Sequence, residues 1–293
     1  MTVDYIISQL INGICQGSIY ALMAIGYTVI VGVVGMVTFT YGEIIMVGAF
    51  SAFYILDFSG NNILFSILGG FLTSFIVGGF VYKICYEKFL NAPRHVSLVC
   101  TIGVSILIKN LVQIICGPNQ KPLLNVVENK TFGSGLVTVS VMQLLIIAVV
   151  AICALLLSLL FSKTKTGLKL RLVSQDKTAS YIMGVNVGQT AMLGNCLGCG
   201  LAGVAGVLLA IYYQLIVATM GGNLSMKAFS SSVMGGLTNV GLSAIGGLII
   251  GIVENIGIAV TTASFRDMFA FIFLIIMLVI NPNGLGTRKR GRS

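Results

Sequence analysis

Apolar stretches long enough to cross a lipid bilayer recur along this 293-residue sequence and constrain its fold more than any other feature. A helical crossing needs roughly 20 predominantly apolar residues. Hydrophobic residues make up 57% of the chain and charged residues 9%, whereas soluble domains carry about 25% charged residues. The composition therefore predicts an all-α fold, a polytopic bundle of transmembrane helices.

The apolar runs predict about eight full spans plus one short or re-entrant segment, in a single transmembrane domain over residues 1–293. The region 221–260 is punctuated by glycine and serine, as the broken helices of transporters are, and is expected to cross twice or to re-enter. Single crossings are expected over residues 6–34, 36–56, 63–82, 96–116, 136–161, 189–213 and 268–280.

One long polar stretch, Phe161–Val187, interrupts this apolar pattern. Its basic residues greatly outnumber its single acidic residue, Asp176, and are Lys163, Lys165, Lys169, Arg171 and Lys177. Either Asp176 or Ser174 is suited to cap a short helix, and Gly184 can end that helix in the left-handed conformation. Two short helices joined by a bend would form a docking shape, whereas the alternative is an ordinary basic loop.

Basic residues next to membrane spans mark cytoplasmic loops. The polar stretch and the basic tail Arg288–Arg292 are therefore both expected in the cytoplasm. Five crossings separate the polar stretch from the N-terminus, which places the N-terminus on the outer side.

Two carboxylates lie inside apolar runs, where a charged group is costly unless it faces a cavity or a partner. Glu43 follows the polar interruption at Thr38, and Glu254 follows the glycine-rich region. The alternatives are that Glu43 caps a helix starting at Gly42 or reaches the interface, and that Glu254 is satisfied locally. We assign a predicted polar path through the membrane to Asn12, Thr40, Tyr41, Glu43, Ser230 and Glu254.

Small residues in the apolar runs favour close helix packing. Gly13 and Gly17 form a small-xxx-small pair. The segment Gly198–Gly203 matches the dinucleotide-binding fingerprint, but that fingerprint needs a strand before it and a βαβ unit around it. All seven cysteines lie in or beside apolar segments, and with a single histidine in the chain they suggest packing residues rather than a metal site.

The sequence lacks a phosphate-binding loop, a His-Glu-x-x-His motif and a Gly-x-Ser-x-Gly motif. We therefore expect no enzyme and no cofactor bound by this chain. The net charge of +9 comes from residues gathered in loops, which speaks for membrane orientation and against a nucleic-acid partner. Two functional classes remain: a passive or ion-coupled transporter, and a permease driven by a separate motor subunit.

The polar stretch resembles one known family in Thr166–Arg171, Ser174–Asp176, Ala179, Gly184–Asn186 and Ala202–Gly206. These motifs resemble the permease subunits of branched-chain amino acid ABC importers, of the LivH type. Further matching motifs follow in order over nearly the whole chain: Asn12-Gly13, Tyr20–Leu22, Thr38–Glu43, Thr101–Gly103, Lys227–Phe229, Gly235-Gly236, Gly246-Gly247, Glu254 and Asn281–Leu285. The chain departs from the family at Thr38–Glu43, where the usual Asn and His are missing, and at Val240-Gly241, where Pro-Gly is usual.

The resemblance implies an integral permease subunit that carries leucine, isoleucine or valine across a bacterial plasma membrane. It implies two cytoplasmic ATPase subunits that hold ATP and magnesium, a sister or identical second permease, and an extracytoplasmic binding protein. It also implies a coupling loop at about residues 162–188, with ATPase contacts at Arg171, Gln175, Asp176, Ala179 and Gly184. The alternatives are a permease for urea or short amides, and an ion-coupled carrier that uses Glu43, Glu254 or Lys109.

Overall fold

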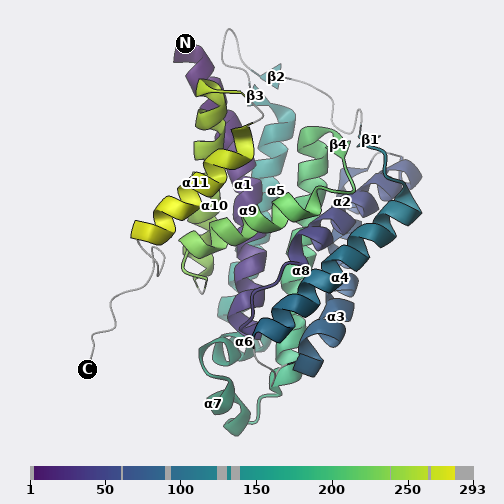
Figure 1. Ribbon diagram of the computed structural model, residues 1–293, viewed down its shortest axis with the longest axis vertical. Coiled ribbons are helices and arrows are strands. Elements are labelled where there is room, and N and C mark those ends of the chain that lie inside the picture. Colours follow the sequence, from purple (N-terminus) through teal and green to yellow (C-terminus); the bar gives the residue numbers. More distant parts are fainter. Residues whose placement is uncertain are drawn as a thin grey trace.

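The computed structural model describes residues 3–60, 62–89, 94–123, 131–132, 139–237, 239–262 and 265–280. Within these residues the chain folds into a helical bundle (Figure 1). Its helices are α1 (Val3–Val34), α2 (Tyr41–Phe58), α3 (Ile63–Val81), α4 (Arg94–Cys116), α5 (Val141–Lys163), α6 (Lys165–Gln175), α7 (Lys177–Ile182), α8 (Val187–Tyr213), α9 (Gly221–Met234), α10 (Val240–Val260) and α11 (Arg266–Ile280).

Short elements connect some of these helices. A π-helical turn, Tyr82–Tyr86, and a 3₁₀ turn, Glu87–Phe89, continue α3. Strand β1 (Lys121–Pro122) pairs antiparallel with β4 (Leu215–Ile216), and β2 (Thr131–Phe132) pairs with β3 (Val139–Ser140).

Seven of the described helices are long and apolar enough to span a membrane, namely α1, α2, α3 with its π turn, α4, α5, α8 and α10. This confirms the predicted all-α, polytopic bundle. The expected C-terminal crossing corresponds to α11, which has 15 residues in the described part of the chain. Helix α9 has only 14 residues, too few for the roughly 20 of a full crossing, and it corresponds to the predicted short segment.

The two most buried spans are α1 and α8, whereas most of α4 and α5 is not buried. In Figure 1 helix α4 lies at the front of the bundle. In Figure 1 the pair α6 and α7 lies at one end, and the N-terminus and the β1–β4 pairing lie towards the other. Helix α9 crosses the front of the bundle obliquely and is followed by α10 and α11 on one side.

Glycine pairs allow the central helices to approach each other at backbone distance. A Cβ added to Gly13 or Gly17 of α1 would meet the backbone of α10 at Gly251, Ile252 or Leu248. This confirms the close contact predicted from the small-xxx-small spacing. Gly203, in the segment that mimics a dinucleotide fingerprint, packs against Gly70 and Ser74 of α3 inside the bundle.

The crossing of α1 and α10 gives a direct prediction. In Gly251→Val the new side chain would collide with the backbone of Gly17, and overpacking of this kind typically costs about 1–3 kcal/mol, occasionally more. We expect a lower melting temperature in detergent and a lower folded yield. Gly32→Val on α1 is the control because no atom lies within 4 Å of its added Cβ; equal melting of the two variants would contradict the close crossing.

Two helices begin later than the apolar runs suggest, each for a local reason. Helix α5 begins at Val141 rather than near residue 136 because Ser140 and Gln143 form a capping box. Helix α2 begins at Tyr41 rather than Met36, after the polar interruption that the sequence shows at Thr38. The seven cysteines are all free thiols.

Candidate functional site

Four charged side chains from α9, α10 and α11 meet inside the bundle. The ammonium nitrogen of Lys227 lies 2.6 Å from Glu254 Oε1 and 2.7 Å from Asp267 Oδ1. Arg266 Nε lies 3.6 Å from the same Glu254 oxygen. The side chain of Glu254 is fully buried and that of Lys227 is 5% exposed. With two cations and two anions, this charge network is neutral as a whole.

Polar residues of α1 and α8 complete the surroundings of Glu254. Gln16 Nε2 contacts Glu254 Oε2 at 3.4 Å and the hydroxyl of Tyr213 at 2.8 Å. Asn255 donates to Gln16 Oε1, and Lys227 donates to the hydroxyl of Tyr20 at 3.1 Å. The prediction that Glu254 faces the protein interior is therefore confirmed, and its charge is balanced by named partners.

The network is costly to break because its groups are removed from water. Removing one partner from a buried ion pair destabilises proteins by about 3–5 kcal/mol, since the other charge is left uncompensated. The charge network therefore fixes the short helix α9 against α1, α10 and α11.

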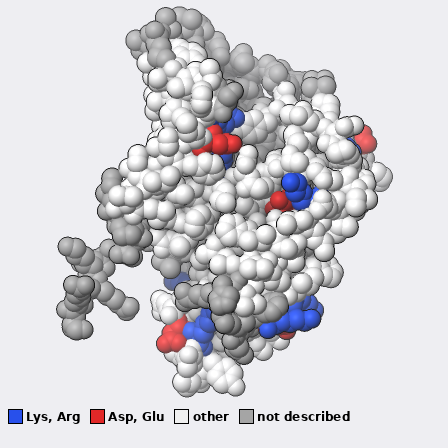
Figure 2. Space-filling model, viewed as in Figure 1, with Lys and Arg blue, Asp and Glu red and all other residues white. Residues whose placement is uncertain are grey.

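Asp267 and Arg266 form the more accessible edge of the network, with side chains 42% and 30% exposed. They line a cleft of about 190 Å³ together with Asn223 and Lys227. Figure 2 shows positive and negative groups close together in the upper half of this face, which is otherwise mostly uncharged.

Glu43 occupies a second polar site, separate from the charge network. It lies in the first turn of α2 and is 3% exposed. The start of α9 packs directly on it, because a Cβ added to Gly221 would meet its carboxylate. Two helix N-termini therefore meet at Glu43, where their dipoles favour a negative charge.

The surroundings of the Glu43 carboxylate include α4. Ser105 of α4 lies 3.5 Å from Glu43 Oε1. Its other oxygen, Oε2, has no hydrogen-bond partner among the described residues. The prediction that Glu43 faces the protein interior is confirmed by its burial. The two alternatives are wrong, because α2 starts at Tyr41 and Glu43 lies buried inside it without bonding to a helix NH.

The other residues of the predicted path are distributed over several places. Thr40 is buried and donates to the carbonyl of Thr101, and Tyr41 donates to the carbonyl of Met23. Asn12 accepts from Gln143 of α5 at 2.7 Å. Ser230 is buried and donates to its own helix at Met226. Thr40 and Tyr41 therefore accompany Glu43, whereas the hydrogen bonds of Asn12 and Ser230 within the described residues go to other groups.

The polar stretch folds into the two short helices that its pattern predicts. Asp176 caps α7 by accepting from the backbone NH groups of Thr178 and Ala179. Gly184 ends it with φ +78°, and the NH groups of Gly184 and Val185 bond back to the carbonyls of Tyr181 and Ser180. This pattern is a Schellman motif.

The alternative cap, Ser174, is wrong. Ser174 lies inside α6 and donates to the carbonyl of Arg171. The helix that contains Ser174 is itself capped by Thr164, whose hydroxyl accepts from the NH of Gly167. A helix cap needs an extended backbone, which Thr164 and Asp176 have and a residue inside a helix lacks.

Two basic side chains attach this helix pair to the spans. Lys177 donates to the carbonyl of Val34, at the end of α1, at 2.6 Å. Arg171 donates to the carbonyl of Phe161, in the last turn of α5. Cations stabilise helix C-termini because the last carbonyls carry partial negative charge.

The remaining surface of the pair is open. Gln175, Asp176 and Gly184 are exposed, and Ala179 is half-buried. The apolar side chains of Tyr181, Ile182 and Met183, at the end of α7, are 59–79% exposed.

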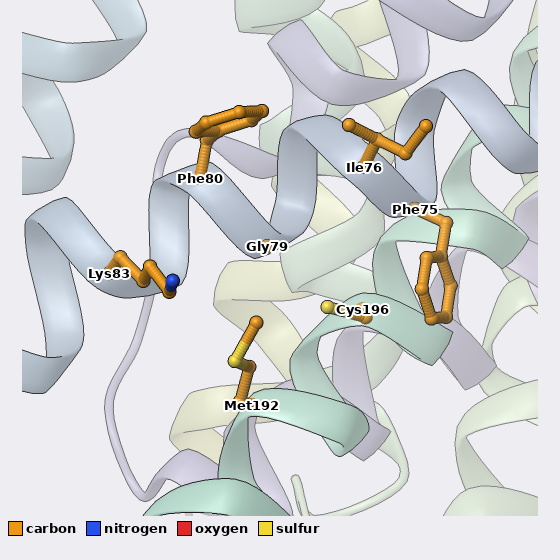
Figure 3. Close-up of a pocket in the computed structure, with 7 residues that line it drawn as sticks. All are labelled: Phe75, Ile76, Gly79, Phe80, Lys83, Met192 and Cys196. Atoms are coloured by element: carbon orange, nitrogen blue, oxygen red, sulfur yellow. The ribbon is translucent and has the colours of Figure 1, made fainter.

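A further pocket lies between α3 and α8 (Figure 3). Its walls are apolar and sulfur-bearing, with Phe75, Met192 and Cys196 among them, and Lys83 is the charged residue of its lining. A pocket with such walls offers no pair of opposite charges and is a weak candidate for a polar ligand.

Most of the charge network is not predicted from the sequence. Lys227 stands out only within a family motif, and Arg266 and Asp267 do not stand out, because the paired residues lie 12 to 40 positions apart along the chain. A search for opposite charges inside apolar runs would have paired Lys227 with Glu254.

Comparisons with known proteins identify the family. Residues 9–280 match the family model described as "Branched-chain amino acid transport system / permease component". The permease protein LivH of Salmonella typhimurium is 30% identical over 96% of this chain and 95% of its own length. BraD of Pseudomonas aeruginosa is 32% identical over 95% of each chain, and a probable LivH of Methanocaldococcus jannaschii is 27% identical over 94% and 90%.

Among solved structures, PsaBC from Streptococcus pneumoniae in complex with Fab covers 96% of this chain and 91% of its own, with 14% identity and a TM-score of 0.46. That likeness is too weak to support an argument. The family match spans nearly the whole chain and agrees with the multi-pass helical bundle. The chain therefore belongs to the permease component family of branched-chain amino acid transport systems.

Proposed function

We propose that this chain is the permease subunit of an ABC importer that translocates leucine, isoleucine and valine. The family assignment and the names of the relatives support this proposal, since LivH and BraD are named as branched-chain amino acid permeases. The chain has no phosphate-binding loop of its own, so ATP and magnesium belong to partner ATPase subunits. An extracytoplasmic binding protein and a second permease, sister or identical, complete the proposed importer.

The capped pair α6–α7 carries the proposal. Its ends are fixed by Thr164, Asp176 and Gly184, and its two basic anchors reach the ends of α1 and α5. A partner that moves this pair would therefore move two spans directly. We place the ATPase contact on the open surface that includes Gln175, Asp176 and the end of α7.

The proposed path runs past the two buried charged sites. The first site lies where the short helix α9 meets α2, at Glu43, Thr40 and Tyr41. The second lies farther along α9, where Lys227 pairs with Glu254 of α10. Short and interrupted helices expose polar groups at membrane depth in transporters. The proposed path also includes Asn12 of α1 and Ser230 of α9, which are polar side chains on two of the helices that carry the charged sites.

Co-purification provides the test. The chain is isolated in mild detergent from cells that express its neighbouring genes. We expect ATPase subunits to accompany it, whereas an ion-coupled carrier would be isolated without them. A permease for urea or short amides would also bring ATPases, and uptake of radiolabelled leucine against radiolabelled urea separates the two.

We further propose that α6, α7 and the C-terminus face the cytoplasm, and that the N-terminus faces outward. Residues 281–293 lie outside the described residues. The proposed cytoplasmic position of the tail is supported by its basic charge. An impermeant thiol reagent applied to intact cells should leave Ser174→Cys and Ser293→Cys unlabelled. It should label Asn119→Cys, at the opposite end; external labelling of either serine position would contradict this topology.

A further inference from the structure

The cleft beside the charge network combines two kinds of surface. It opens between the end of α8, the start of α9 and the start of α11, and its volume is about 190 Å³. Its lining includes the cations Lys227 and Arg266 and the anion Asp267, which pairs with Lys227. The rest of the lining is polar at Tyr20, Tyr213 and Asn223 and apolar at Leu209, Leu215, Met220 and Leu224.

This combination matches one class of ligand. An α-amino acid carries a carboxylate and an ammonium group on one carbon, so it needs both signs of charge close together. An aliphatic side chain on the same carbon needs an apolar wall, because burial of apolar surface is favourable. At about 30 Å³ per water molecule, the cleft holds roughly six waters, a volume suited to one small amino acid.

We propose that this cleft binds the zwitterionic α-amino acid during import, with the carboxylate on Lys227 and Arg266 and the ammonium group on Asp267. The proposal rests on the proposed function and names the place where this subunit holds its substrate. The leucine and methionine side chains of the cleft receive the aliphatic side chain.

The charge network can accept a zwitterion without losing its balance. Lys227 is shared between Glu254, which is fully buried, and Asp267, which is 42% exposed. A substrate carboxylate can replace Asp267 at Lys227 while the Lys227–Glu254 pair stays intact. Asp267, held further by Asn223 at 3.2 Å, then pairs with the substrate ammonium group.

The guanidinium group of Arg266 lines the cleft beside Lys227. Its Nη1 donates to the hydroxyl of Tyr213 at 3.0 Å, and its Nε, buried 3.6 Å from Glu254, has no hydrogen-bond partner within the described residues. A guanidinium group is well suited to a carboxylate because its donors match the two oxygens. On the proposed orientation this end faces outward, where a binding protein would release its ligand.

A photoreactive leucine that carries a diazirine in its side chain tests the proposal on the purified permease–ATPase complex. On illumination the diazirine loses nitrogen and inserts into nearby bonds, and mass spectrometry maps the labelled residues. We expect labelling at Met220, Leu224 or Leu215. Excess leucine should suppress it, whereas leucinamide, which lacks the carboxylate, and the corresponding α-keto acid, which lacks the ammonium group, should not.

A matched pair of methionine variants provides the control. Met220→Trp, at the residue before α9, fills the cleft and should reduce labelling about tenfold, equivalent to about 1.4 kcal/mol in affinity. Met226→Trp, in the second turn of α9, is 42% exposed and outside the cleft lining, and should label like the parent. Labelling elsewhere in the permease, or equal suppression by all three competitors, would overturn the proposal.

Failure of the cleft and failure of the proposed function are distinguishable. If ATP-driven leucine uptake persists in Met220→Trp at the parental rate, the cleft is not the substrate site and the proposed function stands. If the parent complex takes up no leucine with ATP, the proposed function itself is wrong.

Discussion

Glu254→Gln is expected to destabilise the protein by about 3–5 kcal/mol, the range for breaking a buried ion pair, and to abolish uptake. The change leaves one positive charge uncompensated between Lys227 and Arg266, which lie 2.6 and 3.6 Å from the lost carboxylate oxygen. Melting in detergent and the folded yield measure the stability. Glu87→Gln, at an exposed carboxylate, should melt like the parent.

A double variant separates loss of balance from loss of contacts. If uncompensated charge is the cause, Lys227→Gln together with Glu254→Gln should be less destabilising than the sum of the two single changes. Glu43→Gln should have a smaller effect on stability, because among the residues that the structure describes Glu43 hydrogen-bonds to Ser105 alone, at 3.5 Å. Parental melting and uptake in Glu254→Gln would show that the charge network is peripheral.

Gly184→Val is expected to uncouple transport while leaving membrane insertion normal. Gly184 adopts φ +78°, a conformation that costs a β-branched residue about 1–3 kcal/mol. The strain would disrupt the Schellman motif at the end of α7 and reorient the exposed side chains of Tyr181, Ile182 and Met183. We expect weakened ATPase association and lost uptake.

The control for this variant is Thr164→Ser. Serine keeps the hydroxyl that accepts from Gly167, so the cap of α6 remains and both measurements should equal those of the parent. An added Cβ at Gly184 meets no atom within 4 Å, so a loss in Gly184→Val would arise from the backbone and not from a clash. Unchanged association and uptake in Gly184→Val would remove the coupling role.

The sequence was sufficient to predict the parts of the structure that depend on local patterns. The caps at Asp176 and Gly184 involve residues within a few positions of each other. The contact that Gly13 and Gly17 make with α10 depends on the spacing of the two glycines. The short helix α9 was predicted in outline from its glycines and serines.

The parts that depend on distant residues were predicted less well. Glu254 was recognised because an isolated carboxylate in an apolar run is unusual, but its partners on α1, α9 and α11 are assembled only by folding. The sequence favours Ser174 and Asp176 equally as the helix cap, because serine and aspartate are both common N-cap residues. The length of α6 decides between them, since the helix continues past Ser174 to Gln175.

One helix, α1, joins the pair α6 and α7 to the charge network. Helix α1 ends where Lys177 holds Val34, and the same helix carries Gln16, which contacts Glu254. A displacement of α6 and α7 would therefore act on α1 and, through it, on the charge network.

Uptake into proteoliposomes that contain the purified permease, its ATPase partners and the binding protein is the most direct test of the proposed function. We expect uptake of radiolabelled leucine that requires ATP on the side of α6 and α7, persists when sodium and proton gradients are collapsed, and is lost in Gly184→Val. Leucine uptake driven by an ion gradient without ATP, and unchanged in Gly184→Val, would contradict the proposed function.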